Sequence, residues 1–108
     1  MRLFTFFLSL LAVSGVAQAD ELRKIDVQIK DHHFVPDRIE LPAGSKVELV
    51  VTNADADTEE FESKSLKIEK LVPAGKTLSF KIGPLRSGTY DLFGEFHAET
   101  CKGTIVVP

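Results

Sequence analysis

The stretch Val-Glu-Leu-Val-Val-Thr at residues 47–52 indicates the fold class of this 108-residue chain. Val47, Leu49 and Val51 occupy every second position, and a two-residue period of this kind is typical of a strand with one buried face. The same alternation recurs in two other stretches, at residues 25–29 and 78–82. We therefore expect the chain to build its core from strands.

Turn residues separate these runs. Pro-Ala-Gly occurs at residues 42–44 and again at 73–75, and a third turn region covers residues 83–88. Further strands are expected at residues 34–41, with a break at Pro36 and Asp37, at 89–93 and at 104–107. No window of a dozen residues after residue 24 shows helical spacing. The pattern predicts an all-β domain, a sandwich or barrel of about seven short strands.

The first nineteen residues predict a secretory signal peptide. Met1 and Arg2 form a basic head, residues 3–13 are an almost unbroken apolar run, and Ala17 and Ala19 place small residues where a signal peptidase reads. A membrane anchor is the alternative, but the apolar run is too short to cross roughly 30 Å of hydrocarbon as a helix. We expect cleavage after Ala19, no stable membrane anchor, and one domain over residues 20–108.

Charge and cysteine content narrow the function classes. Of the 13 basic residues only Arg2 lies in the leader, and all 16 acidic residues lie beyond it, so the domain has a net charge of −4. An acidic domain is not attracted to nucleic acid or to an anionic membrane surface. Cys101 is the only cysteine of the sequence, which excludes an internal disulfide. The thiol of Cys101 is therefore buried in the core, bound to a metal, or free to link two chains into a dimer.

Polar residues able to bind or react are concentrated in three segments between the expected strands. These segments are Asp31-His32-His33, residues 53–63 and residues 94–101. The loops at one end of an antiparallel sandwich lie together, so three segments distant in sequence can form one site. No Gly-x-Ser-x-Gly motif or phosphate-binding glycine loop accompanies them, and the possible dyads Asp31–His33 and Glu95–His97 therefore carry no specific signal of hydrolysis.

Spacing alone leaves several interpretations of these segments. His97 and Cys101 are residue types that bind copper or zinc, and they could form part of a metal site. Alternatively, His97 is an ordinary loop histidine and Cys101 is packed in the core. The alternating carboxylates Asp55, Asp57 and Glu59 have the spacing of a calcium loop, but the glycine that such a loop needs at its sixth position is absent. A solvated loop is the simpler interpretation.

Three glutamates lie within the four residues Glu59-Glu60-Phe61-Glu62. Strands disfavour glutamate, and like charges this close repel one another unless a cation neutralises them. Alternatively, the three glutamates bind no cation and lie on an exposed edge strand, where their charges prevent aggregation. If Phe61 points into the core, Glu60 and Glu62 share the opposite face, so a bulge would be needed to turn one of them toward a site at the end of the sandwich.

Taken together, the three segments resemble cupredoxins over nearly all of residues 24–107. "DHHFVPDRIELPAG" is similar to the first strand pair of that family, "VELVVTNAD" to its strand ending in an asparagine loop, and "GTYDLFGEFHAETCKGTIVV" to its ligand-bearing C-terminal region. The resemblance implies a Greek-key β-sandwich of about seven strands. It places the family's cysteine ligand on Gly94, its C-terminal histidine on His97, its axial methionine on Cys101 and its first histidine at about Glu60. A trigonal His₂Cys site of the blue-copper type therefore cannot be built here as in the parent family.

A narrower resemblance implies a function. "EEFES" followed by "LKIEK", and "GEFH" near the end, are similar to small periplasmic cupredoxin-like proteins encoded with bacterial iron permeases and to the cupredoxin domain of EfeO-type iron-uptake proteins. It implies a periplasmic helper of high-affinity iron uptake that binds copper and/or iron, with a periplasmic iron-binding protein and a membrane iron permease as partners. Carboxylate and imidazole ligands suit iron and Cu(II).

The candidate metal ligands follow from these motifs. We expect Glu60, Glu62 and His97 to bind the metal, supported by Glu69, Glu95, one of His32 and His33, and Cys101. The function expected is oxidation of Fe(II) or hand-over of iron to the permease. Two alternatives remain at this point: a periplasmic copper carrier without redox turnover, and a metal-free sandwich that serves as an interaction module.

Overall fold

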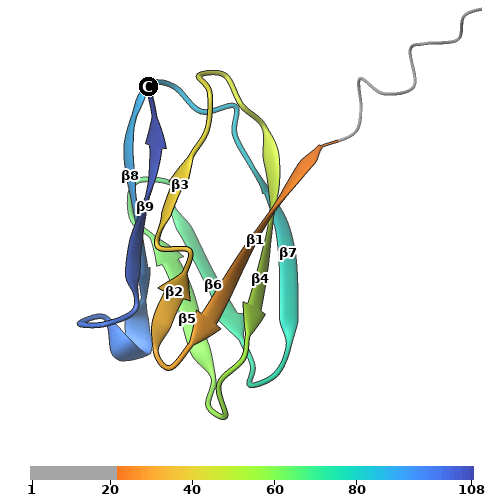
Figure 1. Ribbon diagram of the computed structural model, residues 1–108, viewed down its shortest axis with the longest axis vertical. Helices are drawn as coiled ribbons and strands as arrows, with labels where there is room; N and C mark the ends of the chain where they lie inside the picture. The colour runs from red at the N-terminus through yellow and green to blue at the C-terminus, as the bar shows by residue number, and fades with distance from the viewer. Residues whose placement is uncertain (1–21) are drawn as a thin grey trace, which may run out of the picture.

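The computed structural model describes residues 22–108, which form nine strands and one short 3₁₀ helix (Figure 1). The expected signal peptide at residues 1–19 lies outside the described residues. The elements are β1 (Arg23–Lys30), β2 (His33–Val35), β3 (Arg38–Glu40), β4 (Val47–Asn53), β5 (Glu59–Ser63), β6 (Ile68–Val72), β7 (Thr77–Ile82), β8 (Gly88–Gly94), η2 (Glu95–His97) and β9 (Lys102–Val107).

The strands make two sheets, which confirms the all-β sandwich. One sheet has the order β2-β1-β4-β7 and the other β3-β9-β8-β5-β6. Strand β1 pairs with β4, and β3 with β9, in parallel; the remaining pairs are antiparallel. Parallel pairs between strands far apart in the sequence show that the chain crosses between layers rather than running as a simple meander.

Two features explain why nine strands form where about seven were expected. The stretch expected as one interrupted strand at residues 34–41 is two strands, and β2 and β3 belong to different sheets. Pro36 lies between them, and because proline has no N–H to give to a ladder, the chain leaves one sheet there and joins the other. Strand β6 was not expected as a strand. It is an edge strand, mostly exposed, so it lacks the alternation of a half-buried strand.

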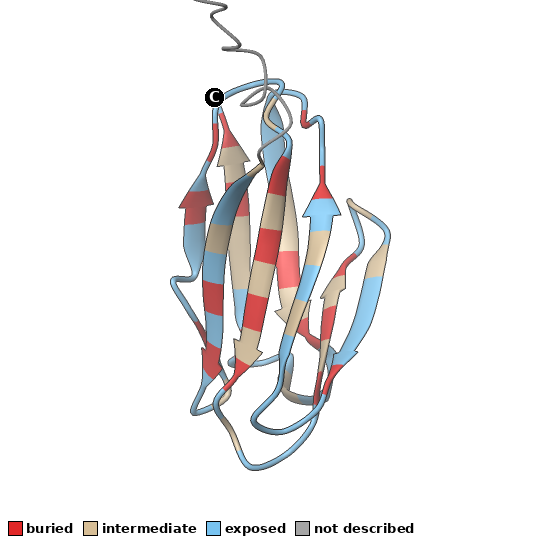
Figure 2. Ribbon diagram, turned by 90° about the vertical axis from the view of Figure 1, so that its right-hand side faces the viewer, coloured by how far each residue is buried: buried red, intermediate tan, exposed pale blue. Residues whose placement is uncertain are grey.

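The core lies between the two sheets and follows the expected alternation. Every second residue of β4 is buried, from Val47 to Asn53, and Figure 2 shows the resulting buried bands along the strands. Phe61 is fully buried in β5, and the rings of Phe34 and Phe80 meet it edge-on from the opposite sheet at centroid distances of 5.5 Å. Such aromatic pairs stabilise a core beyond the area that they bury.

The register of β5 decides what its side chains face. Glu59, Phe61 and Ser63 are buried, while Glu60 and Glu62 lie on the other face. Phe61 pairs with Gly94 of β8, which brings the end of β8 and the start of η2 beside the start of β5. No bulge turns Glu60 inward, so the alternation at Phe61 continues through the strand and buries the carboxylate of Glu59 instead.

Three connections lie together at the end of the sandwich drawn lowest in Figure 1. They are the two-residue turn between β1 and β2, the loop at residues 54–58 between β4 and β5, and η2 with the turn that follows it. The expectation that these three segments meet is confirmed. Within residues 22–108, no helix has the length and apolar character needed to cross a membrane.

Candidate metal centre

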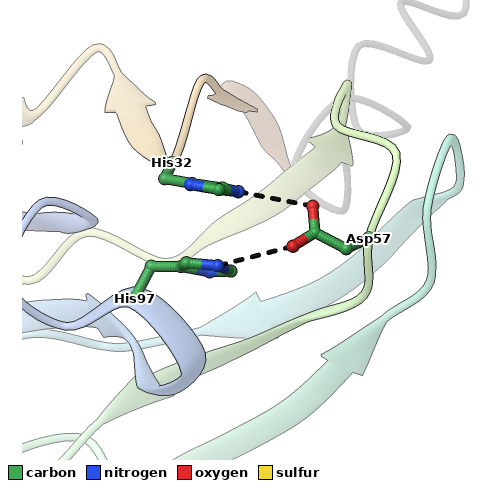
Figure 3. A group of neighbouring side chains, drawn as sticks. All are labelled: His32, Asp57 and His97. Atoms are coloured by element: carbon green, nitrogen blue, oxygen red, sulfur yellow. Dashed lines mark hydrogen bonds and ion pairs between the residues drawn. The ribbon is translucent and has the colours of Figure 1, made fainter.

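His32, Asp57 and His97 come from the three connections and meet at this end of the sandwich (Figure 3). The two imidazole rings are stacked, with centroids 3.5 Å apart and planes at 11°. Nε2 of His32 lies 3.3 Å from one carboxylate oxygen of Asp57, and Nε2 of His97 lies 3.4 Å from the other. One ligand atom from each residue lies within 4.8 Å of the other two, so the group offers two nitrogens and an oxygen to one ion.

The turn that presents His32 has an uncommon backbone. Asp31 and His32 have φ values of 52° and 59°, the left-handed conformation that a two-residue hairpin turn with φ positive at both positions requires. The carboxylate of Asp55 accepts hydrogen bonds from both backbone N–H groups, at 2.7 Å and 3.0 Å. Asp55 therefore offsets part of the conformational cost of the turn and holds the backbone that carries His32.

The pKa of Asp55 reflects this role. Burial raises it, but the hydrogen bonds from the amides of His32 and Asp31, together with the attraction of the two imidazole rings, outweigh burial and hold the pKa below its usual value. A low pKa keeps the carboxylate ionised, and the ionised form is the one that accepts both hydrogen bonds.

Asn53 organises the loop that carries Asp55 and Asp57. Its side chain is completely buried, and Nδ2 donates to the carbonyl oxygens of Asp57 at 2.8 Å and Val72 at 2.9 Å. Its Oδ1 accepts from the backbone N–H of Asp55 at 2.9 Å. The polar residues at 53, 55, 57 and 59 thus have separate tasks in the structure.

Glu59 lies beneath the group and is only 1% exposed. Oε1 accepts hydrogen bonds from the backbone N–H groups of Phe96, at 2.8 Å, and Glu60, at 3.0 Å. Oε2 lies 2.6 Å from Nδ1 of His97. A buried carboxylate is costly unless it is fully hydrogen-bonded, and these three contacts meet that need.

Gly94 and Cys101 complete the wall behind Glu59. A Cβ atom at position 94 would lie 2.6 Å from Cδ of Glu59 and 2.8 Å from Sγ of Cys101, so a side chain there has no room. Cys101 is completely buried, and burial, followed by the negative charge of Glu59, raises the pKa of its thiol to about 12. The thiol is therefore protonated at neutral pH as long as no metal ion displaces its proton.

The other expected ligands do not join this group. Glu60, Glu62 and Glu69 form a second group whose ligand atoms lie close enough to hold a metal ion, on the outer face of β5 and β6, with Glu62 opposite Glu69 in the ladder. The position beside His97 expected for Glu60 is occupied by Glu59, because the register of β5 turns Glu59 inward. The alternation around Phe61 indicates that Glu59 faces inward. Asp57 and Glu59 are nevertheless not among the candidate metal ligands expected from the sequence.

His33 and Glu95 are exposed at the edge of the centre. His33 begins β2, and its Nδ1 lies 2.7 Å from the carbonyl oxygen of Asp31, while His32 is the histidine that faces His97. Glu95 begins η2 and is exposed. The structure therefore selects His32 from the histidine pair at 32–33, a choice that the sequence left open.

The steric limit at Gly94 leads to a stability prediction. We expect Gly94→Ala to lower the free energy of unfolding by about 1–3 kcal/mol, because the new methyl group overpacks a filled site. Urea unfolding of the full-length protein measures the change. The same substitution in a Cys101→Ala background should cost less, since the sulfur that meets the methyl group is gone; an equal cost in both backgrounds would contradict the packing described here.

The outer carboxylate cluster leads to a pH prediction. A hydrogen bond with Glu62, then partial burial and the charges of Glu62 and Glu69, raise the pKa of Glu60 from 4.5 to about 7. The contribution of the cluster to stability is therefore fully present below pH 4.5 and is lost as the pH rises through about 7.

We expect Glu60→Gln to remove this dependence, so that the variant gains in thermal midpoint relative to the unmodified protein between pH 5 and pH 8. Glu99→Gln, at an exposed loop position, is the control. Parallel pH profiles for the Glu60 variant and the unmodified protein would show that the three carboxyl groups do not interact.

Comparison with known proteins agrees with the architecture. An uncharacterized protein of Rickettsia prowazekii is 41% identical to the chain over 88 residues, which is 82% of this chain and 70% of that protein. Two solved structures show the same fold at low identity. The metal-binding domain of the Cu(I)-exporting P-type ATPase CopA from Streptococcus pneumoniae has a TM-score of 0.69 and 18% identity, covering 79% of this chain and 84% of that one.

The second structure is auracyanin A, a blue copper protein from Chloroflexus aurantiacus. It has a TM-score of 0.69 and 14% identity, and the match covers 82% of this chain and all of that one. The sequence of the chain also matches the family described as the cupredoxin-like domain, over residues 3–107. With a two-sheet β-sandwich, these relatives and a family match across nearly its whole length, the chain belongs to the cupredoxin-like domain family.

Proposed function

We propose that this protein binds a copper or iron ion through His32, Asp57 and His97 and supports iron uptake outside the cytoplasm. The observation that carries the proposal is the convergence of two imidazole nitrogens and one carboxylate within 4.8 Å, from three connections far apart in the sequence. The two histidines and the aspartate remain partly exposed although they lie together, so their donor atoms are accessible to an ion at this end of the sandwich.

The donor set fits the proposed ions. Imidazole suits copper and iron, carboxylate oxygen hardens the site toward Cu(II) and iron, and two histidines with one carboxylate are the protein ligands of many non-haem Fe(II) centres. Metal bonds to such donors are about 2 Å long, so two ligands of one ion lie up to about 4 Å apart. Because the three donor atoms already lie within 4.8 Å, a small inward movement would complete the site.

The ligands are also accessible. The side chains of His97, His32 and Asp57 are 25%, 41% and 55% exposed. A centre open on one side leaves positions for water, dioxygen or a ligand from a partner, which both redox turnover and metal hand-over require. This openness equally favours the second candidate function, a copper carrier that exchanges its metal without turnover.

The environment of the thiol supports carboxylate and imidazole ligation over thiolate ligation. Cys101 is completely buried, and its raised pKa of about 12 means that a metal would have to displace a firmly held proton to bind the thiolate. Gly94 supplies no ligand at the position where the family resemblance places a cysteine. A centre with oxygen and nitrogen ligands favours Fe(III) over Fe(II), which promotes oxidation of bound ferrous iron.

The iron-uptake role rests on the motif resemblance together with this hard donor set. Oxidation of one Fe(II) to Fe(III) releases one electron, and dioxygen or a redox partner is the acceptor. In this proposal the membrane iron permease and a periplasmic iron-binding protein receive or supply the iron. The negative charge of the domain is compatible with attraction of cationic iron species.

A metal titration tests the centre. We expect the chain without residues 1–19 to bind one equivalent of Cu(II), with no intense thiolate-to-copper absorption, and to bind one Fe(II) under anaerobic conditions. His97→Ala and His32→Ala should weaken Cu(II) binding at least about 100-fold, since loss of a direct ligand should exceed the 10–100-fold typical of outer contacts.

His33→Ala is the matched control, because His33 is the exposed neighbour of His32, and it should bind Cu(II) like the unmodified protein. An intense blue absorption would instead assign Cys101 as a ligand. Absence of binding for both metals would overturn the proposal and leave the interaction module as the function.

Turnover separates the leading function from the copper carrier. We expect the protein with its centre free to bind Fe(II) to accelerate the loss of Fe(II) in air, followed with a ferrous chelator, and His97→Ala to abolish the acceleration. The His33→Ala protein should retain it. A protein that binds Cu(II) tightly but leaves the rate of Fe(II) oxidation unchanged would be a carrier, and the redox proposal would fail.

A further inference from the structure

We infer that Asp55 is a positioning residue of the proposed centre. Its carboxylate holds the turn between β1 and β2 in the conformation that places the His32 ring against His97, and so preforms the centre before a metal binds. Asp55 is not one of the three residues that offer a ligand atom. The inference rests on the proposed function for its effect on metal affinity, whereas the contact that it describes needs no metal.

His32 occupies a turn position at which glycine is the usual residue. The turn consists of Asp31 and His32, with φ values of 52° and 59°. Two-residue hairpin turns with positive φ at both positions favour Asn or Asp followed by Gly, because a Cβ atom in the left-handed conformation is sterically unfavourable. A histidine at the glycine position is therefore a backbone outlier, and such outliers are concentrated at functional sites.

Asp55 supplies the acceptors for both N–H groups of this turn. Oδ1 accepts a hydrogen bond from the backbone N–H of Asp31 at 2.7 Å, and Oδ2 accepts from that of His32 at 3.0 Å. The ring of His33 contacts the turn only at the carbonyl oxygen of Asp31, so the two N–H groups depend on Asp55. Hydrogen bonds to an ionised acceptor are stronger than those between neutral groups, which suits Asp55 to hold a strained turn.

The backbone of Asp55 is itself tied to the body of the sandwich. Its N–H donates to Oδ1 of the buried Asn53 at 2.9 Å. The N–H of the intervening Ala54 donates to the carbonyl oxygen of Ile29, near the end of β1, at 2.8 Å. The start of the loop at residues 54–58 is thus fixed beside β1, and the carboxylate of Asp55 carries that support across to the turn.

This support decides which histidine faces the centre. With the turn held, the His32 ring stacks on His97 at a centroid distance of 3.5 Å, while His33 begins β2 and is exposed (Figure 3). Without an acceptor for its N–H groups, the turn relaxes to conformations without the strain at His32, and in these the ring leaves His97. The apparent dissociation constant of a metal rises as the fraction of molecules in the binding-competent conformation falls. Asp55 therefore contributes to affinity through the backbone of a ligand residue.

Proton NMR of the protein without added metal tests the positioning directly. We expect nuclear Overhauser contacts between the ring protons of His32 and His97 in the unmodified protein, because the two rings are stacked. Asp55→Ala should abolish these contacts, and Asp55→Asn, which keeps one acceptor oxygen, should weaken them. Glu99→Gln is the control, since it removes a negative charge from an exposed position in the turn after η2. Full ring contacts in a folded Asp55→Ala or Asp55→Asn protein would overturn the inference.

The affinity for Cu(II) tests the consequence. Asp55→Ala should weaken Cu(II) binding about 10–100-fold, the range typical of residues that orient a metal ligand without touching the metal. Glu99→Gln should leave the affinity unchanged at physiological ionic strength, where exposed charges are screened. Equal losses in the two variants would show that only the charge of Asp55 matters, and the positioning role would fail.

A second substitution separates positioning from direct attraction of a cation. Asp31→Gly adopts a positive φ without steric cost, and it removes a further negative charge from this end of the sandwich. In the Asp55→Ala background it should restore the ring contacts and part of the Cu(II) affinity. Attraction by charge predicts a further fall, and that result would contradict the inference. Ring contacts that depend on Asp55 in a protein that binds no metal would overturn the proposed function and leave the positioning contact established.

Discussion

The burial of Phe61 between Phe34 and Phe80 sets the orientation of strand β5, and the metal centre depends on that orientation. Side chains of a strand alternate between its faces, so the inward position of Phe61 also buries Glu59 and leaves Glu60 outside. A slip of one residue would exchange the two glutamates and place an aromatic ring in water. The hydrophobic core therefore chooses which carboxylate meets His97.

A buried carboxylate then requires the rest of the arrangement. Glu59 needs donors, which the start of η2 and the His97 ring supply, and it needs space, which Gly94 leaves. Within residues 22–108, no buried side-chain nitrogen or oxygen lacks a hydrogen-bond partner. Polar groups that are fully paired in this way hold a site rigidly, because every alternative arrangement leaves a donor or acceptor unsatisfied.

Neighbouring groups of the same chemical type have different properties here because their surroundings differ. Glu59 is enclosed by donors, whereas Glu60 lies beside two other carboxyl groups and its pKa is raised to about 7. His32 faces the centre in a left-handed turn held by Asp55, whereas His33 points to solvent in a regular strand. The centre is built by loop conformation as much as by the choice of ligand residues.

The sequence by itself determined the all-β architecture, most strand positions, the inward residues of β4 and the meeting of three polar segments at one end. These properties follow from alternation and turn residues, which are local. Only the tertiary structure decided that Asp57 and His32 lie beside His97, and that the buried carboxylate of Glu59 contacts the His97 ring. Those contacts depend on a positive φ at His32, on the crossover at Pro36 and on the pairing of β5 with β8. No local pattern encodes these contacts, because each joins side chains from segments distant in the chain, whose relative positions are decided by how the two sheets pack.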